Sequence, residues 1–304
     1  MSAGAFAVAL GAIALALGGC GLAVGPAPSG VQLLVTRSFG ARVLHGNGGL
    51  KAASGQTVMG LLRSEDAVRT SSSGRIVQSI DGAEGAQGDS EGWFYYVNGL
   101  APRRSANATP VQPGDHIWWD LHRQVQGLKV PAVVGAFPEP FLNGSEGRRF
   151  PVRVECASGS AAACETVAAA LRRVNVPAAI SALGSGSAPE TLRVMVAPWG
   201  GLETLQSQNL ARGPRASGVY ARFAEGGSAL VLLGETGEPV QTLHGGVGLI
   251  AATRQEKEAP VWLITGTDQT GVELAARAFD QTTLADRFAV ALTTGGSIAL
   301  PDLR

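Results

Sequence analysis

The stretch "GWFYYVNGL" at residues 92–100 places four aromatic residues in succession, although aromatic residues make up only 6% of the chain. Side chains alternate between the faces of a strand, so Trp93 and Tyr95 share one face while Phe94 and Tyr96 share the other. The Asn-Gly pair that follows is the strongest local signal for a hairpin turn, because a type I′ turn needs positive φ at both central positions. We therefore predict a strand that ends in a tight turn.

A second aromatic strand is predicted within "VQPGDHIWWDLHR", which follows about ten residues later. Ile117, Trp119 and Leu121 share its apolar face, and Trp118 lies on the opposite, more polar face. The segment 58–65, "VMGLLRSE", predicts a short amphipathic helix that must bury its leucines on an apolar surface. We therefore expect residues 93–97 and 116–122 to be antiparallel neighbours, with the Trp119 face against this helix and Thr57 as its N-cap.

The order of elements defines the fold class of the first part, residues 31–125. Two strands ("VQLLVTRSF" and "ARVLHGNGGL"), a helix and then several short strands are typical of a β-grasp-like α+β domain. The combination of "SIDG", "GWFYYVNG" and "VQPGDHIWWD" over residues 31–123 resembles the transcobalamin-like C-terminal domain family. The resemblance implies a domain that caps cobalamin against a helical barrel. The residues themselves indicate no cofactor, and the rest of the chain has no barrel pattern.

The aromatic residues of these two strands are the candidate ligand-stacking residues Trp93, Tyr95, Tyr96 and Trp118. One interpretation is that they pack, some in the core and some beneath the segment that follows. The other is an open stacking surface for a small planar ligand or an envelope protein. No metal site is predicted on the second strand, because His116, Asp120 and His122 spread over about 13–20 Å along it.

The remainder of the chain indicates a linker and a second domain. Residues 126–150 are rich in Pro and Gly, and their apolar side chains (Val133, Val134, Phe137, Phe141) are suited to docking on a domain surface. Residues 151–304 alternate strands and helices, which predicts an α/β domain with a mixed sheet. We expect a β-hairpin around 219–236, a helix capped by Asp268 and a final strand at 287–292.

The N-terminus predicts export. Residues 3–19 are uncharged and mostly apolar, and "ALGGC" ends at Cys20. This pattern resembles a bacterial lipoprotein signal at residues 1–20, with lipidation of Cys20 and a Gly/Pro/Ser tether at 21–30. The alternative is an uncleaved membrane anchor. Both place the rest of the chain outside the cytoplasm, held at the outer face of the cell membrane.

Cysteine content agrees with export. Cys156 and Cys164 are the only cysteines after Cys20, and an even count in an exported chain predicts a disulfide. Two buried free thiols are the alternative. A metal site is not expected here, because no His lies nearby to complete a tetrahedral shell.

Composition and motifs narrow the function. Lys and Arg number 24, as do Asp and Glu, so no electrostatic footprint for nucleic acid is present. We expect a membrane-anchored lipoprotein that binds a ligand or acts as an adaptor and serves an uptake system. An enzyme is less expected. The alternatives are a secreted hydrolase-like enzyme with Ser217, His244 and Asp268, although no G-x-S-x-G elbow is present, or a structural interaction protein.

Overall fold

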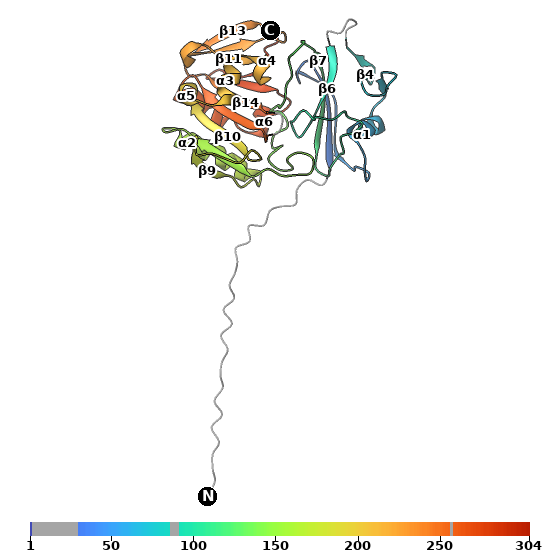
Figure 1. Cartoon of the computed structure of the whole chain (residues 1–304), viewed down its shortest axis with the longest axis horizontal. Helices are drawn as coiled ribbons and strands as arrows, with labels where there is room; N and C mark the ends of the chain where they lie inside the picture. The colour runs from blue at the N-terminus through green and yellow to red at the C-terminus, as the bar shows by residue number, and fades with distance from the viewer. Residues whose placement is uncertain (2–29, 86–90, 256–257) are drawn as a thin grey trace.

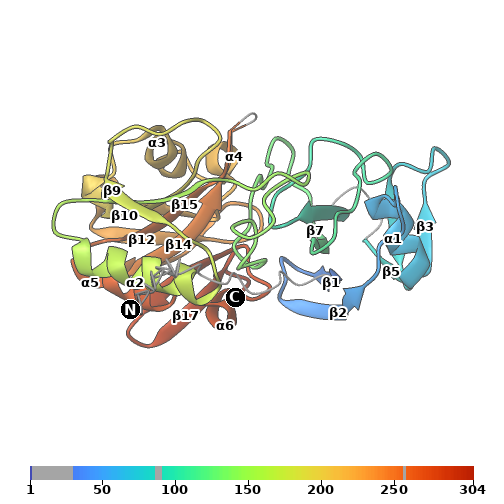
Figure 2. The same cartoon turned by 90° about the horizontal axis from the view of Figure 1, so that it is seen from below.

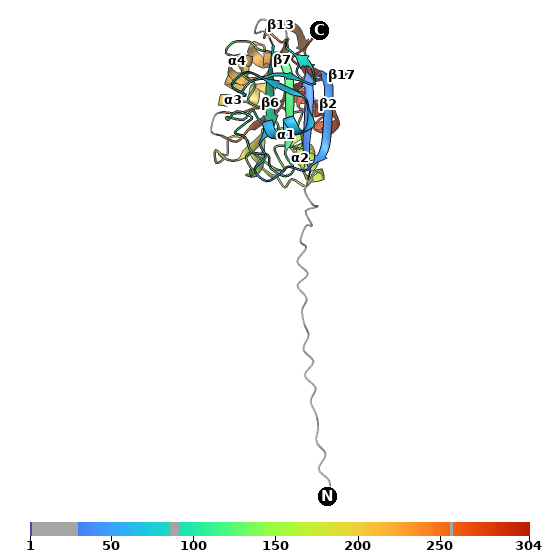
Figure 3. The same cartoon turned by 90° about the vertical axis from the view of Figure 1, so that its right-hand side faces the viewer.

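The computed structural model describes residue 1 and residues 30–85, 91–255 and 258–304. The predicted signal peptide, Cys20 and nearly all of the tether lie outside these residues. Figures 1 and 2 show two domains side by side, an N-terminal domain in blue to cyan and a C-terminal domain in yellow to red. The green segment that joins them lies between the two. In Figure 3 the N-terminal domain lies in front of its neighbour.

The N-terminal domain is a mixed four-stranded sheet covered on one face by a helix. The strand order is β2-β1-β7-β6, with β1 and β7 parallel and the two outer pairs antiparallel. A small antiparallel sheet, β3-β4-β5, lies beside it. The elements are β1 (Val31–Arg37), β2 (Arg42–Leu50), α1 (Val58–Glu65), β3 (Val68–Thr70), β4 (Val77–Ile80), β5 (Ala83–Glu84), β6 (Glu91–Val97) and β7 (His116–Arg123).

The predicted faces of this sheet are confirmed. β6 and β7 pair antiparallel with Tyr95 opposite Trp119. Trp119 and Ile117 pack with the buried leucines of α1 in one apolar core. Thr57 caps α1, since its hydroxyl accepts a hydrogen bond from the amide of Gly60 at 3.1 Å. The fold class follows from this arrangement, because an amphipathic helix and a strand with one apolar face bury each other.

The C-terminal domain is built on a mixed seven-stranded sheet of order β17-β16-β14-β15-β10-β8-β9. Helices α2 and α5 pack on one face, and a three-stranded sheet, β11-β12-β13, covers the other. The sheet strands are β8 (Val152–Cys156), β9 (Ala179–Ala182), β10 (Leu192–Pro198), β14 (Gly248–Thr253), β15 (Val261–Gly266), β16 (Ala289–Thr293) and β17 (Gly296–Leu300). The remaining elements are α2 (Ala161–Arg173), η1 (Trp199–Gly201), α3 (Leu205–Ala211), α4 (Pro214–Ser217), β11 (Ala221–Phe223), η2 (Glu225–Gly227), β12 (Ala229–Leu233), β13 (Pro239–His244), α5 (Gln269–Arg277) and α6 (Gln281–Leu284).

Two expectations for this domain are confirmed and one is corrected. β11 and β12 form the predicted antiparallel hairpin, and Asp268 caps α5 by accepting from the amide of Gly271 at 2.9 Å. The strand at 289–293 is not the last one, because β17 follows it and pairs with it antiparallel. β17 escapes prediction since it is a largely exposed edge strand, so no apolar alternation marks it.

The segment between the domains is packed. Phe137 and Phe141 are buried in the core of the C-terminal domain, where Phe141 lies 5.0 Å from Trp262 between ring centroids. Val133 is buried between the two domains. Within the part of the chain that the structure describes, no helix is long and apolar enough to cross a membrane.

Candidate functional site

The polar face of the aromatic sheet is covered by the C-terminal domain. Phe288, just before β16, packs among the rings of Phe39, Tyr96, Trp118 and His122, with centroid distances between 5.2 and 5.5 Å. Trp118 and Tyr96 are 0% and 2% exposed. Of the two interpretations for these residues, packing therefore holds for Trp118 and Tyr96, which present no open stacking surface to a ligand. The second domain covers these two rings, and their aromatic area serves the contact between the domains.

A buried polar network runs beneath this contact. The indole of Trp118 donates to the Thr36 hydroxyl at 2.7 Å, and that hydroxyl donates to the Asp120 carboxylate. Asp120 also accepts from the amides of Phe39 and Gly40 and lies 2.7 Å from Nδ1 of His122. The buried carboxylate is thereby satisfied by four donors, which is what burial of a charge requires. This pairing holds the His122 ring in place between Phe39 and Phe94.

The other two stacking candidates, Trp93 and Tyr95, are only half-buried. They line a pocket of about 370 Å³ at the outer edge of β6, together with residues of the linker and of the second domain. Tyr95 is already engaged, since its hydroxyl donates to the carbonyl of Arg104 at 2.6 Å and its ring stacks on Trp119. The Tyr95 ring is therefore held in place by contacts within the protein and does not form an open stacking face for a ligand in this pocket.

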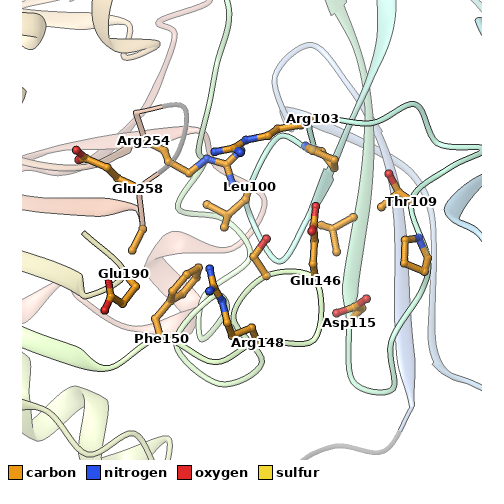
Figure 4. A pocket seen from close by; sticks show the side chains of 15 residues that line it. Leu100, Arg103, Thr109, Asp115, Glu146, Arg148, Phe150, Glu190, Arg254 and Glu258 are labelled. Atoms are coloured by element: carbon orange, nitrogen blue, oxygen red, sulfur yellow. The ribbon is translucent and has the colours of Figure 1, made fainter. Parts of the chain in front are cut away.

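A larger, charged cleft of about 420 Å³ lies between the domains (Figure 4). All three parts of the chain contribute to it. Its charged lining residues are Arg103 and Asp115 of the N-terminal domain, Glu146 and Arg148 of the linker, and Glu190, Arg254 and Glu258 of the C-terminal domain. Leu100, Phe150 and Ala259 supply apolar wall between them. Clefts at domain interfaces are frequent locations for small ligands.

Two arginines approach each other across this cleft. Figure 4 shows the side chains of Arg103 and Arg254 converging from opposite domains. Burial, and next the positive charge of Arg103, lower the pKa of Arg254, while Glu146 raises it. Among the described atoms, Arg254 donates one hydrogen bond, to the carbonyl of Ala101 at 2.5 Å. Among the described residues, no carboxylate lies within 4.0 Å of either guanidinium.

Glu146 occupies a backbone conformation that Glu rarely adopts. Its φ is 53°, and it forms a turn with Gly147 between the bridged residues Ser145 and Arg148. Positive φ at such a turn favours Asn, Asp or Gly, so Glu at this position carries a local strain. The turn presents an exposed carboxylate to the side of the cleft opposite Arg254 (Figure 4). Strained non-glycine residues cluster at functional sites.

The residues of the alternative hydrolase-like site have separate roles. Ser217 is buried, and its hydroxyl donates to the carbonyl of Gly213 at 3.0 Å. Asp268 is used as a helix cap and accepts from the amide of Gly246. His244 lies exposed at the end of β13. No hydrogen bond between described atoms joins any two of the three, so they do not form a triad.

The predicted disulfide is confirmed. Cys156 at the end of β8 and Cys164 in the first turn of α2 are bonded, with their Cα atoms 6.2 Å apart.

On the aromatic strand β7, Asp120 contacts His122, whereas His116 lies apart from them at the start of the strand, where burial lowers its pKa to about 4. The lipidation residue, Cys20, lies outside the described residues.

The charged cleft is what sequence analysis missed. Arg103 belongs to an ordinary polar loop, and Arg254 lies about 150 positions further along the chain. Only the docking of the domains brings them together. The one local signal was "NGSEGRR" at 143–149, whose glycines on either side of an acidic residue indicate a tight turn.

Comparison with known proteins finds a family model that matches part of the chain. A family model described as "Domain of unknown function (DUF4430)" matches residues 55–123. No curated protein matches the chain. A crystal structure from Ruminococcus gnavus ATCC 29149, described as that of a candidate metal binding protein, is similar at 17% identity and a TM-score of 0.27. It covers 32% of this chain and 99% of its own.

Proposed function

We propose that this protein binds a small zwitterionic ligand, such as an amino acid or a short peptide, in the charged cleft between its domains. The observation that carries the proposal is the pair Arg103 and Arg254, which face one cleft from two domains and have no described carboxylate within ion-pair distance. Two guanidinium groups held together repel each other unless an anion lies between them. A ligand carboxylate satisfies both, since guanidinium donors match its two oxygens.

The opposite charge of the ligand is recognised by Glu146. Its carboxylate is held toward the cleft by a strained turn, and it is close enough to Arg254 to influence that residue's pKa. Asp115 is a weaker candidate, because its carboxylate already accepts from Asn98 at 2.8 Å and from the amide of Gln112. The ligand class therefore carries an anionic group that contacts Arg103 and Arg254 and a cationic group that contacts Glu146.

The cellular setting is a further proposal. An apolar segment that ends at Cys20 supports a lipid anchor at the outer face of the cell membrane. The disulfide between Cys156 and Cys164 supports an oxidising compartment. A ligand-binding protein held at that surface suits delivery to an uptake system. Cobalamin is not carried over from the transcobalamin-like family, because a cleft of about 420 Å³ is at the low end of drug-sized pockets and a corrinoid is much larger.

Calorimetry tests the cleft with a charged and a capped peptide and with two free amino acids. Trialanine carries both end charges, and N-acetyl-trialanine amide carries neither. We expect the detergent-solubilised full chain to bind trialanine, and Arg254→Gln and Arg103→Gln each to weaken it at least about tenfold, equivalent to about 1.4 kcal/mol. Arg104→Gln is the matched control, since Arg104 is exposed and outside the cleft lining. Equal binding of the capped peptide would contradict charge recognition, and no binding of trialanine, glycine or glutamate would reject the ligand class.

A further inference from the structure

A second cluster of polar side chains lies in the N-terminal domain, away from the cleft. His45, Asp66 and Asp81 each offer one nitrogen or oxygen atom, and these three atoms lie within 4.8 Å of one another. They come from three different elements, namely β2, the end of α1 and the turn between β4 and β5. Nothing in the sequence spacing marks them as a set, because only the fold brings the elements together.

Backbone geometry and one hydrogen bond fix where the two aspartates of this cluster lie. Asp66 ends α1 in extended conformation (φ −132°, ψ 154°), and its amide still caps the helix by donating to Leu62. Asp81 has a φ of 47° and opens the tight Asp81-Gly82 turn. One of its oxygens accepts from the amide of Ala67 at 2.7 Å, which anchors the carboxylate next to Asp66. The site is therefore organised by secondary structure and does not depend on flexible side chains alone.

Asp66 is the member whose surroundings are incomplete. Its side chain is 0% exposed, and neither of its carboxylate oxygens accepts a well-formed hydrogen bond from a described donor. Nδ1 of His45 lies 2.7 Å from Oδ1, and this imidazole is the only basic group of the described residues within ion-pair distance. Burying a carboxylate without partners costs free energy, so such groups are normally paired or bound to a metal.

The charges around the cluster favour a cation. The carboxyls of Asp81 and Glu65 both lie close enough to Asp66 to interact with it electrostatically. Glu65 itself accepts a hydrogen bond from Asn47 on β2. Among the described residues, no lysine or arginine forms an ion pair with Asp66 or Asp81. Three carboxylates thus face one imidazole, and a divalent cation is the ion that balances them.

We propose that His45, Asp66 and Asp81 bind a divalent transition-metal cation, with Zn²⁺ as the first choice. An imidazole nitrogen suits zinc, whereas magnesium and calcium are bound through oxygen. Three protein ligands leave one tetrahedral position for water or for a group from outside. His45 is half-buried and Asp81 is exposed, so the site is open to solvent for metal entry. The competing explanation is a simple ion pair between His45 and Asp66.

Metal binding is measured on untagged, detergent-solubilised full chain after treatment with a chelator. We expect calorimetry with Zn²⁺ to show one site that depends on the cluster, and Co²⁺ to give a visible absorption band upon binding. Asp66→Asn and His45→Gln should each weaken Zn²⁺ binding at least about tenfold and abolish the Co²⁺ band. Asp66→Asn removes a buried charge at nearly constant volume, so the fold is retained.

Matched controls separate this site from other ligands. Glu165→Gln changes an exposed acidic residue on α2, and His244→Ala removes an exposed histidine on β13, both outside the cluster. Both should bind Zn²⁺ as the wild type does. Absence of Zn²⁺ binding, or binding and a Co²⁺ band that survive in Asp66→Asn and His45→Gln, would overturn the proposal. The cleft variants Arg103→Gln and Arg254→Gln should not affect metal binding, so the two proposals fail independently.

Discussion

Trp118 of the N-terminal domain packs edge-on against Phe288 of the C-terminal domain, with ring centroids 5.2 Å apart. The same indole donates a hydrogen bond to Thr36, which in turn donates to the buried carboxylate of Asp120. One side chain thereby links the sheet, its polar network and the neighbouring domain. The strand β7 thus belongs to the core of the N-terminal domain and also forms the surface on which the C-terminal domain packs. This contact positions the cleft between Arg103 and Arg254.

Truncation of Trp118 should therefore be costly. We expect Trp118→Ala to lower the free energy of unfolding by about 3–5 kcal/mol, as other large core truncations do. Trp93→Ala is the comparison within the same sheet, and its effect should be smaller because Trp93 is only half-buried. Urea unfolding followed by circular dichroism measures both. A loss under about 1 kcal/mol for Trp118→Ala would contradict its role in the contact between the domains.

The disulfide should contribute a moderate amount of stability. Cys156 and Cys164 are separated by 8 positions, and closing so short a loop stabilises by about 2–3 kcal/mol in the chain-entropy model. We expect the double variant Cys156→Ala, Cys164→Ala to lose that amount in urea unfolding, and reductant to destabilise the wild type but not the variant. Peptide mass spectrometry should find both thiols alkylated only after reduction. Alkylation without reductant would show that the bond does not form.

Local chemistry explains how far sequence analysis reached. The turn at Asn98-Gly99 has the predicted positive φ values, 54° and 73°, and Thr57 and Asp268 cap the helices they were expected to cap. These features depend on neighbours within a few residues. The opposite faces of Trp118 and Trp119 also follow from alternation alone. The sequence does not determine what covers the Trp118 face, because packing and ligand binding require the same aromatic residues.

The missed features share one physical cause, which is contact over long distances in sequence. Phe288 meets Trp118 from 170 positions away, and residues 248–253 form the strand β14, all of whose residues are buried. A strand buried on both faces has no alternation to detect. The sequence gives no signal that His45, Asp66 and Asp81 form a cluster. They come together only because α1 and the β4–β5 turn pack next to β2 in the fold.

Lipidation of Cys20 should change the mass and the processing of the protein. We expect the mature wild type to begin at a lipid-modified Cys20, and Cys20→Ala to keep residues 1–19 and lack the lipid. Intact-mass spectrometry of the membrane fraction measures both, with Ser29→Ala in the tether as a control that stays lipidated. An identical processed mass and unchanged membrane retention in Cys20→Ala would contradict the lipoprotein proposal.

Glu139, in the segment between the domains, should make stability depend on pH. Burial raises the pKa of its carboxyl from the ordinary 4.5 to about 7, although hydrogen bonds from Asn143 oppose the shift. The folded protein therefore binds more protons than the unfolded chain between these values. Stability should fall as the pH rises from about 4.5 to 7 and then level off, with a total loss of up to about 3 kcal/mol from this group.

Replacing Glu139 separates this effect from other titrations. Glu139→Gln resembles the protonated carboxyl, so the variant should match the wild type near pH 4.5 and be more stable than it above about pH 7. Glu165→Gln, on the exposed face of α2, should keep the pH dependence of the wild type. Urea unfolding at several values between about pH 5 and pH 8 measures the difference. A constant offset between Glu139→Gln and the wild type over that range would mean that the hydrogen bonds from Asn143 outweigh burial and keep the carboxylate ionised throughout.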